Sequence, residues 1–167
     1  MTLRTATIAL LVVLLPSLAA AQAGSRSVPR LPEPAGLAEV FQRDELTGLA
    51  LSGLDPVTFF LPDGPKPGRM ELQIVWAGVA WRFASEANKA AFVASPDVYA
   101  PRIGGYDALA ASQKRIVNAS PAFHVVRDGR LYLFRSEDSR THFLADATIP
   151  ARSEEAWLGL RAELVQR

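Results

Sequence analysis

Cysteine is absent from this chain, and several kinds of chemistry are absent with it. A protein without thiols has no disulfide, no thiolate metal ligand and no cysteine nucleophile. Histidine is scarce as well, with two residues among 167. We find no His-Glu-x-x-His, no Gly-x-Ser-x-Gly, no phosphate-binding glycine-rich loop and no EF-hand. Stability must therefore come from packing, and the sequence shows no assembled catalytic set.

An excess of one charge sign is also missing. The chain has 18 basic and 17 acidic residues, and one basic residue, Arg4, lies in the apolar N-terminal segment. The remainder is neutral with histidine uncharged, and it contains no block of Lys and Arg. Because nucleic-acid binding needs such a basic footprint, we expect no nucleic-acid partner.

No hydrophobic run is long enough to cross a bilayer. The longest candidate, residues 8–18, is well short of the roughly 20 residues that a transmembrane helix needs. It follows Arg4 and precedes two small-residue triplets, 19–21 and 21–23, which both fit a signal cleavage site. We therefore assign residues 1–23 to a signal peptide. We expect a periplasmic or secreted protein with no stable membrane anchor after cleavage.

What the chain does contain fits one modest domain behind a spacer. Residues 24–36 carry three prolines among small and polar residues, which favours an extended tether. Residues 37–167 have a length that suits a single domain with its own core. Its first residues, 37–42, are predicted to form a turn or two of helix. We find no internal repeat in the sequence.

Alternating apolar residues predict two β-hairpins. Residues 70–76 and 79–83 alternate in hydrophobicity, as half-buried strands do. Residues 123–126 and 131–134 flank Asp128-Gly129, which is a strong hairpin signal. Residues 49–53 are predicted to be a further short strand.

Helix-start signals follow these strands. Ser85 and Ser136 are predicted N-caps, and Asp55 is a predicted N-cap with a proline behind it at the first helical position. After Pro150, an apolar stripe predicts a last helix over residues 153–165. These elements predict an α+β fold, in which a small antiparallel sheet of two hairpins has short helices packed on one face.

Three stretches together resemble a known family in their order and spacing. They are the Asp-Pro opening at Asp55, the Trp-Arg-Phe-Ala-Ser run at 81–85, and residues 97–108, which contain Gly-Gly-Tyr-Asp-Ala. This pattern is similar to the YHS-domain family in its exported bacterial form, over roughly residues 49–160. The family's last turn typically reads Gly-Gly-Tyr-Cys-Ala, so Asp107 stands where a cysteine is usual. The resemblance implies the fold, but not the chemistry usually tied to that thiol.

Four side chains are candidates for ligand binding: Asp55, Tyr106, Asp107 and His124. Asp55 is also explained by N-capping. Asp107 could line a pocket with Tyr106, or it could cap a helix over residues 108–111. His124 alternates with Phe123 and Val125 and would face solvent or a groove if those two face the core.

A metal site has little support. Asp138, His142 and Asp146 lie four residues apart on one helical face and could in principle hold a divalent ion. Phe143 marks the apolar face, however, and the charged row falls on the opposite, solvated side. We expect no cofactor and no tight zinc or copper site, and at most a weak oxygen-rich site involving Asp107.

These observations favour an exported, non-enzymatic YHS-like domain that binds a small ligand, a metal or an envelope protein partner. One alternative is a hydrolytic or redox enzyme that uses Asp55, Tyr106, Asp107 or His124. Such an enzyme would need at least two of these side chains within hydrogen-bond reach in one cleft. A second alternative is a structural subunit of an envelope complex, which a large exposed apolar patch would favour.

Overall fold

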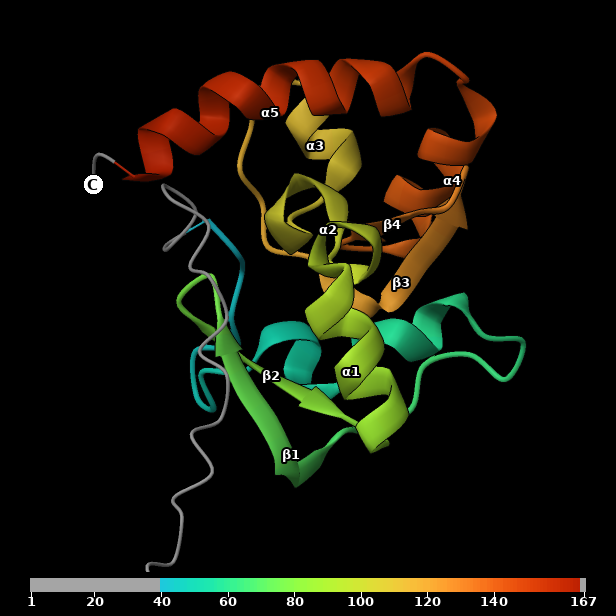
Figure 1. Ribbon diagram of the computed structural model, residues 1–167. Helices are drawn as coiled ribbons and strands as arrows, with labels where there is room; N and C mark the ends of the chain where they lie inside the picture. The colour runs from blue at the N-terminus through green and yellow to red at the C-terminus, as the bar shows by residue number, and fades with distance from the viewer. Residues whose placement is uncertain (1–39, 166–167) are drawn as a thin grey trace, which may run out of the picture. The chain divides into compact units, whose positions relative to one another are not determined.

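The computed structural model describes residues 40–165 (Figure 1). The predicted signal peptide (1–23), the predicted spacer (24–36) and residues 37–39 lie outside this range. Within the range, no helix is long and apolar enough to cross a membrane. In chain order the elements are η1 (Ala50–Gly53), η2 (Pro56–Phe60), β1 (Arg69–Trp76), β2 (Val79–Phe83), α1 (Glu86–Ala94), α2 (Pro96–Tyr99), η3 (Arg102–Gly105), α3 (Ala108–Ser112), β3 (Ser120–Arg127), β4 (Arg130–Phe134), α4 (Glu137–Ala145) and α5 (Ile149–Val165).

The predicted α+β class is confirmed, and both predicted hairpins form. β1 pairs with β2 and β3 pairs with β4, antiparallel in each case, as two separate two-stranded sheets. Ala77 and Asp128 each take a positive φ before a glycine that does the same, which is the backbone of the tight turns that suit hairpins. α1 packs against β2, and α4 packs against β3 and β4 (Figure 1).

The two hairpins belong to two copies of one structural unit, which the sequence analysis did not detect. Residues 50–94, the first repeat, run through a left-handed turn, a short helix, a hairpin and a Ser-capped helix. Residues 102–145, the second repeat, follow the same order. Even the strand registers agree: Phe83 faces Arg69 across a bulge, and Phe134 faces Ser120 across an equivalent bulge.

The repeat is difficult to detect in the sequence, because the residues that the two copies share are few and isolated. The segment between the buried aspartate and the hairpin is also one residue shorter in the second repeat. Most of the kept residues serve local geometry or packing: turn glycines, helix caps and buried phenylalanines. The identical pairs are Gly53 and Gly105, Asp55 and Asp107, Val75 and Val126, Gly78 and Gly129, Phe83 and Phe134, Ser85 and Ser136, Glu86 and Glu137, Phe92 and Phe143, and Ala94 and Ala145.

Two hydrophobic cores lie on the two sides of β4. Leu131 and Leu133 belong to the core of the first repeat, which also holds the ring of Trp81. Tyr132 and Phe134 belong to a second core, which α5 closes. Since successive side chains of a strand point to opposite faces, β4 is buried on both faces and joins the two repeats.

Three expectations about local structure are wrong. Residues 49–53 are not a strand, because Leu51 and Ser52 take left-handed φ values of 52° and form η1. Residues 40–42 are not helical. The last helix begins at Ile149 rather than Ser153, with Pro150 inside its first turn, where the missing N–H of proline has no helical partner to lose.

Candidate functional site

Asp55 stabilises the fold of the first repeat through buried hydrogen bonds. Its carboxylate is fully buried at the N-cap of η2, where Oδ1 accepts the Val57 N–H at 2.9 Å. Oδ2 accepts the Ala84 N–H and the side-chain amide of Asn88, both at 2.7 Å. The side chain therefore ties the left-handed turn to the end of the hairpin and to α1.

Asp107 makes equivalent backbone hydrogen bonds in the second repeat. It is fully buried at the N-cap of α3, where Oδ1 accepts the Ala110 N–H at 2.8 Å. Oδ2 accepts the Arg135 N–H, just past β4, also at 2.8 Å. The capping alternative for Asp107 is thus confirmed. Each of its two oxygens accepts a hydrogen bond from a backbone N–H of the fold, and neither faces a ligand site.

Tyr106 and His124 lie in unrelated surroundings. Tyr106 is half-buried with its ring 5.8 Å from that of Trp157, and burial raises the pKa of its hydroxyl. His124 is half-buried with its ring edge-on to Phe59 at 5.0 Å, and its Nδ1 lies 2.9 Å from the Pro121 carbonyl. The structure therefore does not assemble the four candidate residues into one site.

The charged row on α4 is a solvated face, as expected. Asp138 and His142 are exposed, while Phe143 on the other side of the helix is fully buried. His142 Nδ1 contacts the Asp138 carbonyl, and Asp146 accepts from the N–H and hydroxyl of Thr148. Within residues 40–165, no three His, Asp or Glu side chains gather closely enough to hold a metal ion.

Three of the six non-glycine residues with a positive φ in residues 40–165 lie in the two equivalent turns. Leu51 and Ser52 of η1 have φ values of 52°, and Ile103 of η3 has a φ of 57°. A non-glycine residue in this left-handed region costs about 1–2 kcal/mol, because its Cβ crowds the backbone. Such strain persists only where surrounding structure imposes it, and it clusters at binding and catalytic sites.

Both turns border one cavity of about 380 Å³ between the repeats, which we call the cleft. Leu51 and Ser52 come from the first turn, and Gly105 comes from the second. Cavities that hold small ligands measure about 300–1,000 Å³, so the cleft is of adequate size. Its position at the junction of two similar units is also typical of ligand sites.

The cleft combines apolar side chains with polar ones. Phe41, Leu51 and Leu133 supply apolar surface, whereas Ser52 and Asn118 supply a hydroxyl and an amide that are exposed. The acidic group of Asp44 is occupied by its own loop, where hydrogen bonds from Thr47 lower its pKa. Neither histidine of the chain is among the residues described as lining the cleft. Arg43 and Glu45 also line the cleft, but none of the four candidate residues does. The arrangement can hold an amphipathic ligand.

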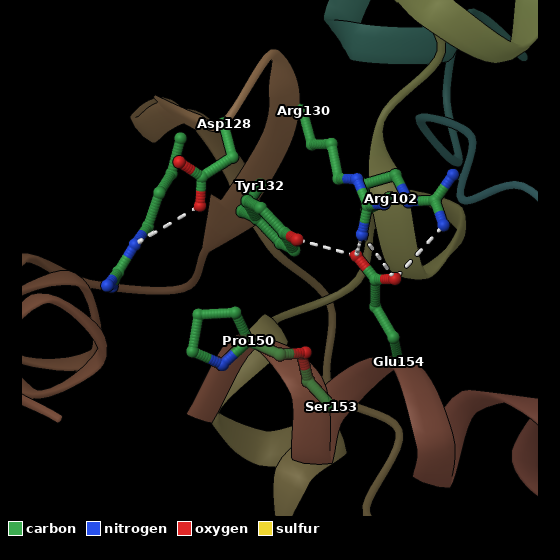
Figure 2. Close-up of polar contacts among 8 residues, drawn as sticks. Arg102, Asp128, Arg130, Tyr132, Pro150, Ser153 and Glu154 are labelled. Carbon is green, nitrogen blue, oxygen red and sulfur yellow. Dashed lines mark hydrogen bonds and ion pairs between the residues drawn. The ribbon is translucent and has the colours of Figure 1, made fainter. Parts of the chain in front are cut away.

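A second polar cluster surrounds Glu154 of α5 (Figure 2). Arg130 Nη1 donates to both carboxylate oxygens at 2.9 and 2.8 Å, Arg102 Nη2 donates at 3.2 Å, and the Tyr132 hydroxyl donates at 2.6 Å. These donors come from η3 and β4, so the cluster fastens α5 onto the second repeat. The role of the cluster is structural, because the converging donors already bind the carboxylate of Glu154.

The cluster also moves the pKa values of two of its members in opposite directions. Burial, together with the hydrogen bond to Glu154, raises the pKa of Tyr132 to about 12. Burial alone would raise the pKa of Glu154 too, but the hydrogen bonds from Tyr132 and Arg102 outweigh it. The pKa of Glu154 therefore lies below its ordinary value, and the carboxylate is ionised at neutral pH.

Sequence reasoning missed both the cleft and the Glu154 cluster. One signal for the cleft was available: Gly53 and Gly105 each precede a capping aspartate by two positions, ahead of a predicted hairpin. A search for this spacing would have placed the two turns in equivalent positions. The Glu154 cluster left no such signal, because its members are far apart in the chain.

Comparison with known proteins finds no relative. No protein-family model, no curated protein and no solved structure matches the chain. The arguments about function therefore rest on the geometry of the molecule itself.

Proposed function

We propose that the protein is an exported, non-enzymatic binding module of the YHS-domain type, whose ligand is held in the cleft between the repeats. The observation that carries the proposal is that two equivalent turns border one cavity of ligand size, where the first turn contributes the strained Leu51 and Ser52 and the second contributes Gly105. Strain of this kind is retained where a backbone must present its groups in a fixed way. The export assignment rests on the signal-like pattern of residues 1–23.

An enzymatic function has less support. Catalysis by the candidate residues would require at least two of them in one cleft, within hydrogen-bond reach. Asp55 and Asp107 are instead enclosed, with their oxygens engaged by the fold. Removing either carboxylate from its partners would leave buried N–H groups unsatisfied, which is costly. Both are better explained as structural residues than as acids or bases.

A purely structural subunit is also less well supported than a binding module. Large apolar side chains are exposed on several different elements, including Leu46 in the loop before η1, Met70 and Val75 on β1, and Leu158 on α5. Exposed apolar residues scattered in this way are common on soluble proteins and do not define an interface. A cavity of ligand size, lined by both apolar and polar side chains, is the more specific feature.

The proposal is tested by nuclear magnetic resonance on the ¹⁵N-labelled protein. We expect some members of a library of small aromatic amides and alcohols to cause saturable shifts of the Ser52 and Ser120 amide signals. Asn118→Trp places a large ring at an exposed position of the cleft and should abolish these shifts. Gln113→Trp, at an exposed position after α3, is the matched control and should leave them unchanged. The proposal fails if no compound moves the cleft signals, or if Asn118→Trp has no effect.

A further inference from the structure

The turn of the second repeat is covered by the chain's own N-terminal arm, which we define as residues 40–42. The Gln42 N–H donates to the Gly104 carbonyl at 2.8 Å. A Cβ added to Gly104 would lie 2.3 Å from the Val40 carbonyl oxygen and 2.8 Å from the Trp157 ring. Position 104 therefore has to be glycine, because the arm lies directly on the backbone of the turn.

The arm is held in the way that proteins hold an extended peptide. The Phe41 ring lies 5.2 Å from the ring of Trp76 and 5.5 Å from that of Trp81. The Gln42 side-chain amide donates to the Ala119 carbonyl at 2.9 Å and accepts the Ala119 N–H at 2.8 Å. An aromatic anchor, a backbone hydrogen bond and a paired amide together fix three residues that have no regular secondary structure.

The equivalent turn of the first repeat is uncovered by the described part of the chain. Ser52, two positions before Leu54-Asp55, corresponds to Gly104, two positions before Tyr106-Asp107. Gly104 is buried, whereas Ser52 is exposed and borders the cleft. Among residues 40–165, no backbone N–H outside its own turn donates to the Ser52 carbonyl. Position 52 is exposed, so a serine side chain is accommodated there.

We infer that the cleft binds an extended segment of a partner protein, with a backbone N–H donated to the Ser52 carbonyl and an aromatic or aliphatic side chain against Phe41, Leu51 and Leu133. This inference rests on the proposed function and names its ligand. The basis for this choice of ligand is the other repeat, where the equivalent turn accepts a hydrogen bond from the Val40-Phe41-Gln42 segment through the Gly104 carbonyl. Recognition through backbone hydrogen bonds plus one or two side-chain pockets is a recurring way of binding peptides.

A second copy of this chain is the less favoured occupant. Its arm carries the right chemistry, but that arm is already engaged in its own subunit through Gly104 and Ala119. Releasing it would break these hydrogen bonds and withdraw Phe41 from between two tryptophans. A segment from another protein carries no such cost.

The test uses a synthetic peptide with the sequence of residues 37–44, Leu-Ala-Glu-Val-Phe-Gln-Arg-Asp, blocked at both ends. Titrated into the ¹⁵N-labelled protein, it should shift the amide signals of Ser52, Gly53 and Asn118, while the Gly104 signal stays in place. A second peptide with N-methylglutamine lacks the donor N–H and should bind about tenfold more weakly, the value of one lost hydrogen bond to a carbonyl left unpaired. A third, with alanine for phenylalanine, should also bind more weakly.

Three results would overturn the inference. The first is equal binding of the N-methylated peptide, and the second is a shift of Gly104 instead of Ser52, which would mean that the peptide displaces the arm. The third is binding of small aromatic amides in the cleft without any peptide binding, which leaves the proposed function standing. If neither compounds nor peptides move the cleft signals, the proposed function fails together with the inference. Repeating the titration with Asn118→Trp and Gln113→Trp separates cleft binding from binding elsewhere.

Discussion

The two repeats share a framework but differ in what covers them. In the first repeat, Trp76, Trp81 and Phe92 form an aromatic cluster under β2, and the indole N–H of Trp81 donates to the Trp76 carbonyl at 3.0 Å. In the second repeat, the strand position of Trp81 is taken by Tyr132, whose hydroxyl reaches Glu154 on α5. Both aromatic residues are buried, and each satisfies its one polar group with the nearest available acceptor.

This comparison distinguishes the features that both repeats share from the features that only one of them has. The left-handed turn, the buried aspartate and the Ser-capped helix occur in both repeats, so they make the unit itself stable. Within residues 40–165, the packing of α5, the Glu154 cluster and the arm's hydrogen bond to Gly104 occur at the second repeat and have no counterpart at the first. The first repeat keeps its turn open at the cleft, and this asymmetry is what a binding function requires.

The largest expected effect comes from removing the two aspartates. Asp55→Ala and Asp107→Ala should each lower the free energy of unfolding by about 3 kcal/mol, because each leaves buried N–H groups without an acceptor. Asp55→Ala should cost more, since Asn88 is a third donor with no counterpart at Asp107. Urea denaturation followed by circular dichroism measures both. Asp107→Asn, which keeps one acceptor oxygen, is the control and should cost less than Asp107→Ala. If Asp107→Ala and the wild type have equal urea midpoints, the stabilising role of Asp107 is refuted.

Exchanging the turn residues tests the covered and open turns directly. Gly104→Ser should destabilise the protein by about 2–3 kcal/mol, because the new Cβ meets the Val40 carbonyl and Trp157. Ser52→Gly should stabilise it by up to about 1 kcal/mol by relieving a left-handed serine. Thermal unfolding of both variants gives the sign of each change. A mild effect of Gly104→Ser would show that the arm does not lie on this turn in solution.

A smaller, pH-dependent effect is expected at Glu154. Since its pKa is lowered in the folded protein, its contribution is present above its ordinary value of 4.5 and is lost as the pH falls through the lower folded value. Glu154→Gln should therefore cost about 1 kcal/mol at pH 7 and less at pH 3, where part of the contribution is already lost. Unfolding by urea at the two pH values measures this. A cost that does not change with pH would mean that the carboxylate charge is irrelevant to the docking of α5.

The same cluster predicts a loss of stability on the alkaline side. Tyr132 has a folded pKa of about 12, raised from 10, so its contribution is complete below pH 10 and is lost as the pH rises from 10 to 12. Tyr132→Phe keeps the ring and should remove this part of the alkaline dependence. The equivalent change in the first repeat, Trp81→Phe, is the control, because an indole does not titrate in this range.

The smallest effect is expected at the hairpin turns. Ala77 and Asp128 hold equivalent positions with φ values of 48° and 52°. Asp tolerates this conformation better than Ala, because its short polar side chain can bond the local backbone. Ala77→Gly should therefore stabilise the protein by about 0.5 kcal/mol, whereas Asp128→Gly should be close to neutral. Equal effects of the two changes in thermal unfolding would contradict this reasoning.

The local sequence determined those parts of the fold that neighbouring residues can specify. Asp128-Gly129 selects a tight hairpin turn, and Ser85 and Ser136 cap helices because a hydroxyl can reach an N–H three residues on. Asp55 and Asp107 were identified as capping residues for the same reason. Their second oxygens, which hold hairpin ends about 30 residues away, could not be predicted from these short-range rules.

Only the tertiary structure decided which of these local pieces are equivalent and which of them meet. Leu51 and Ser52 were predicted to lie in a strand, but they form a left-handed turn just before Asp55, whose carboxylate is bonded to the end of the hairpin at Ala84. The cleft, the arm on Gly104 and the donors around Glu154 all join residues far apart in the chain. Sequence periodicity records which face of an element is apolar, but not which distant element covers it. The proposed binding site is such a meeting point, and so it could be seen only in the folded chain.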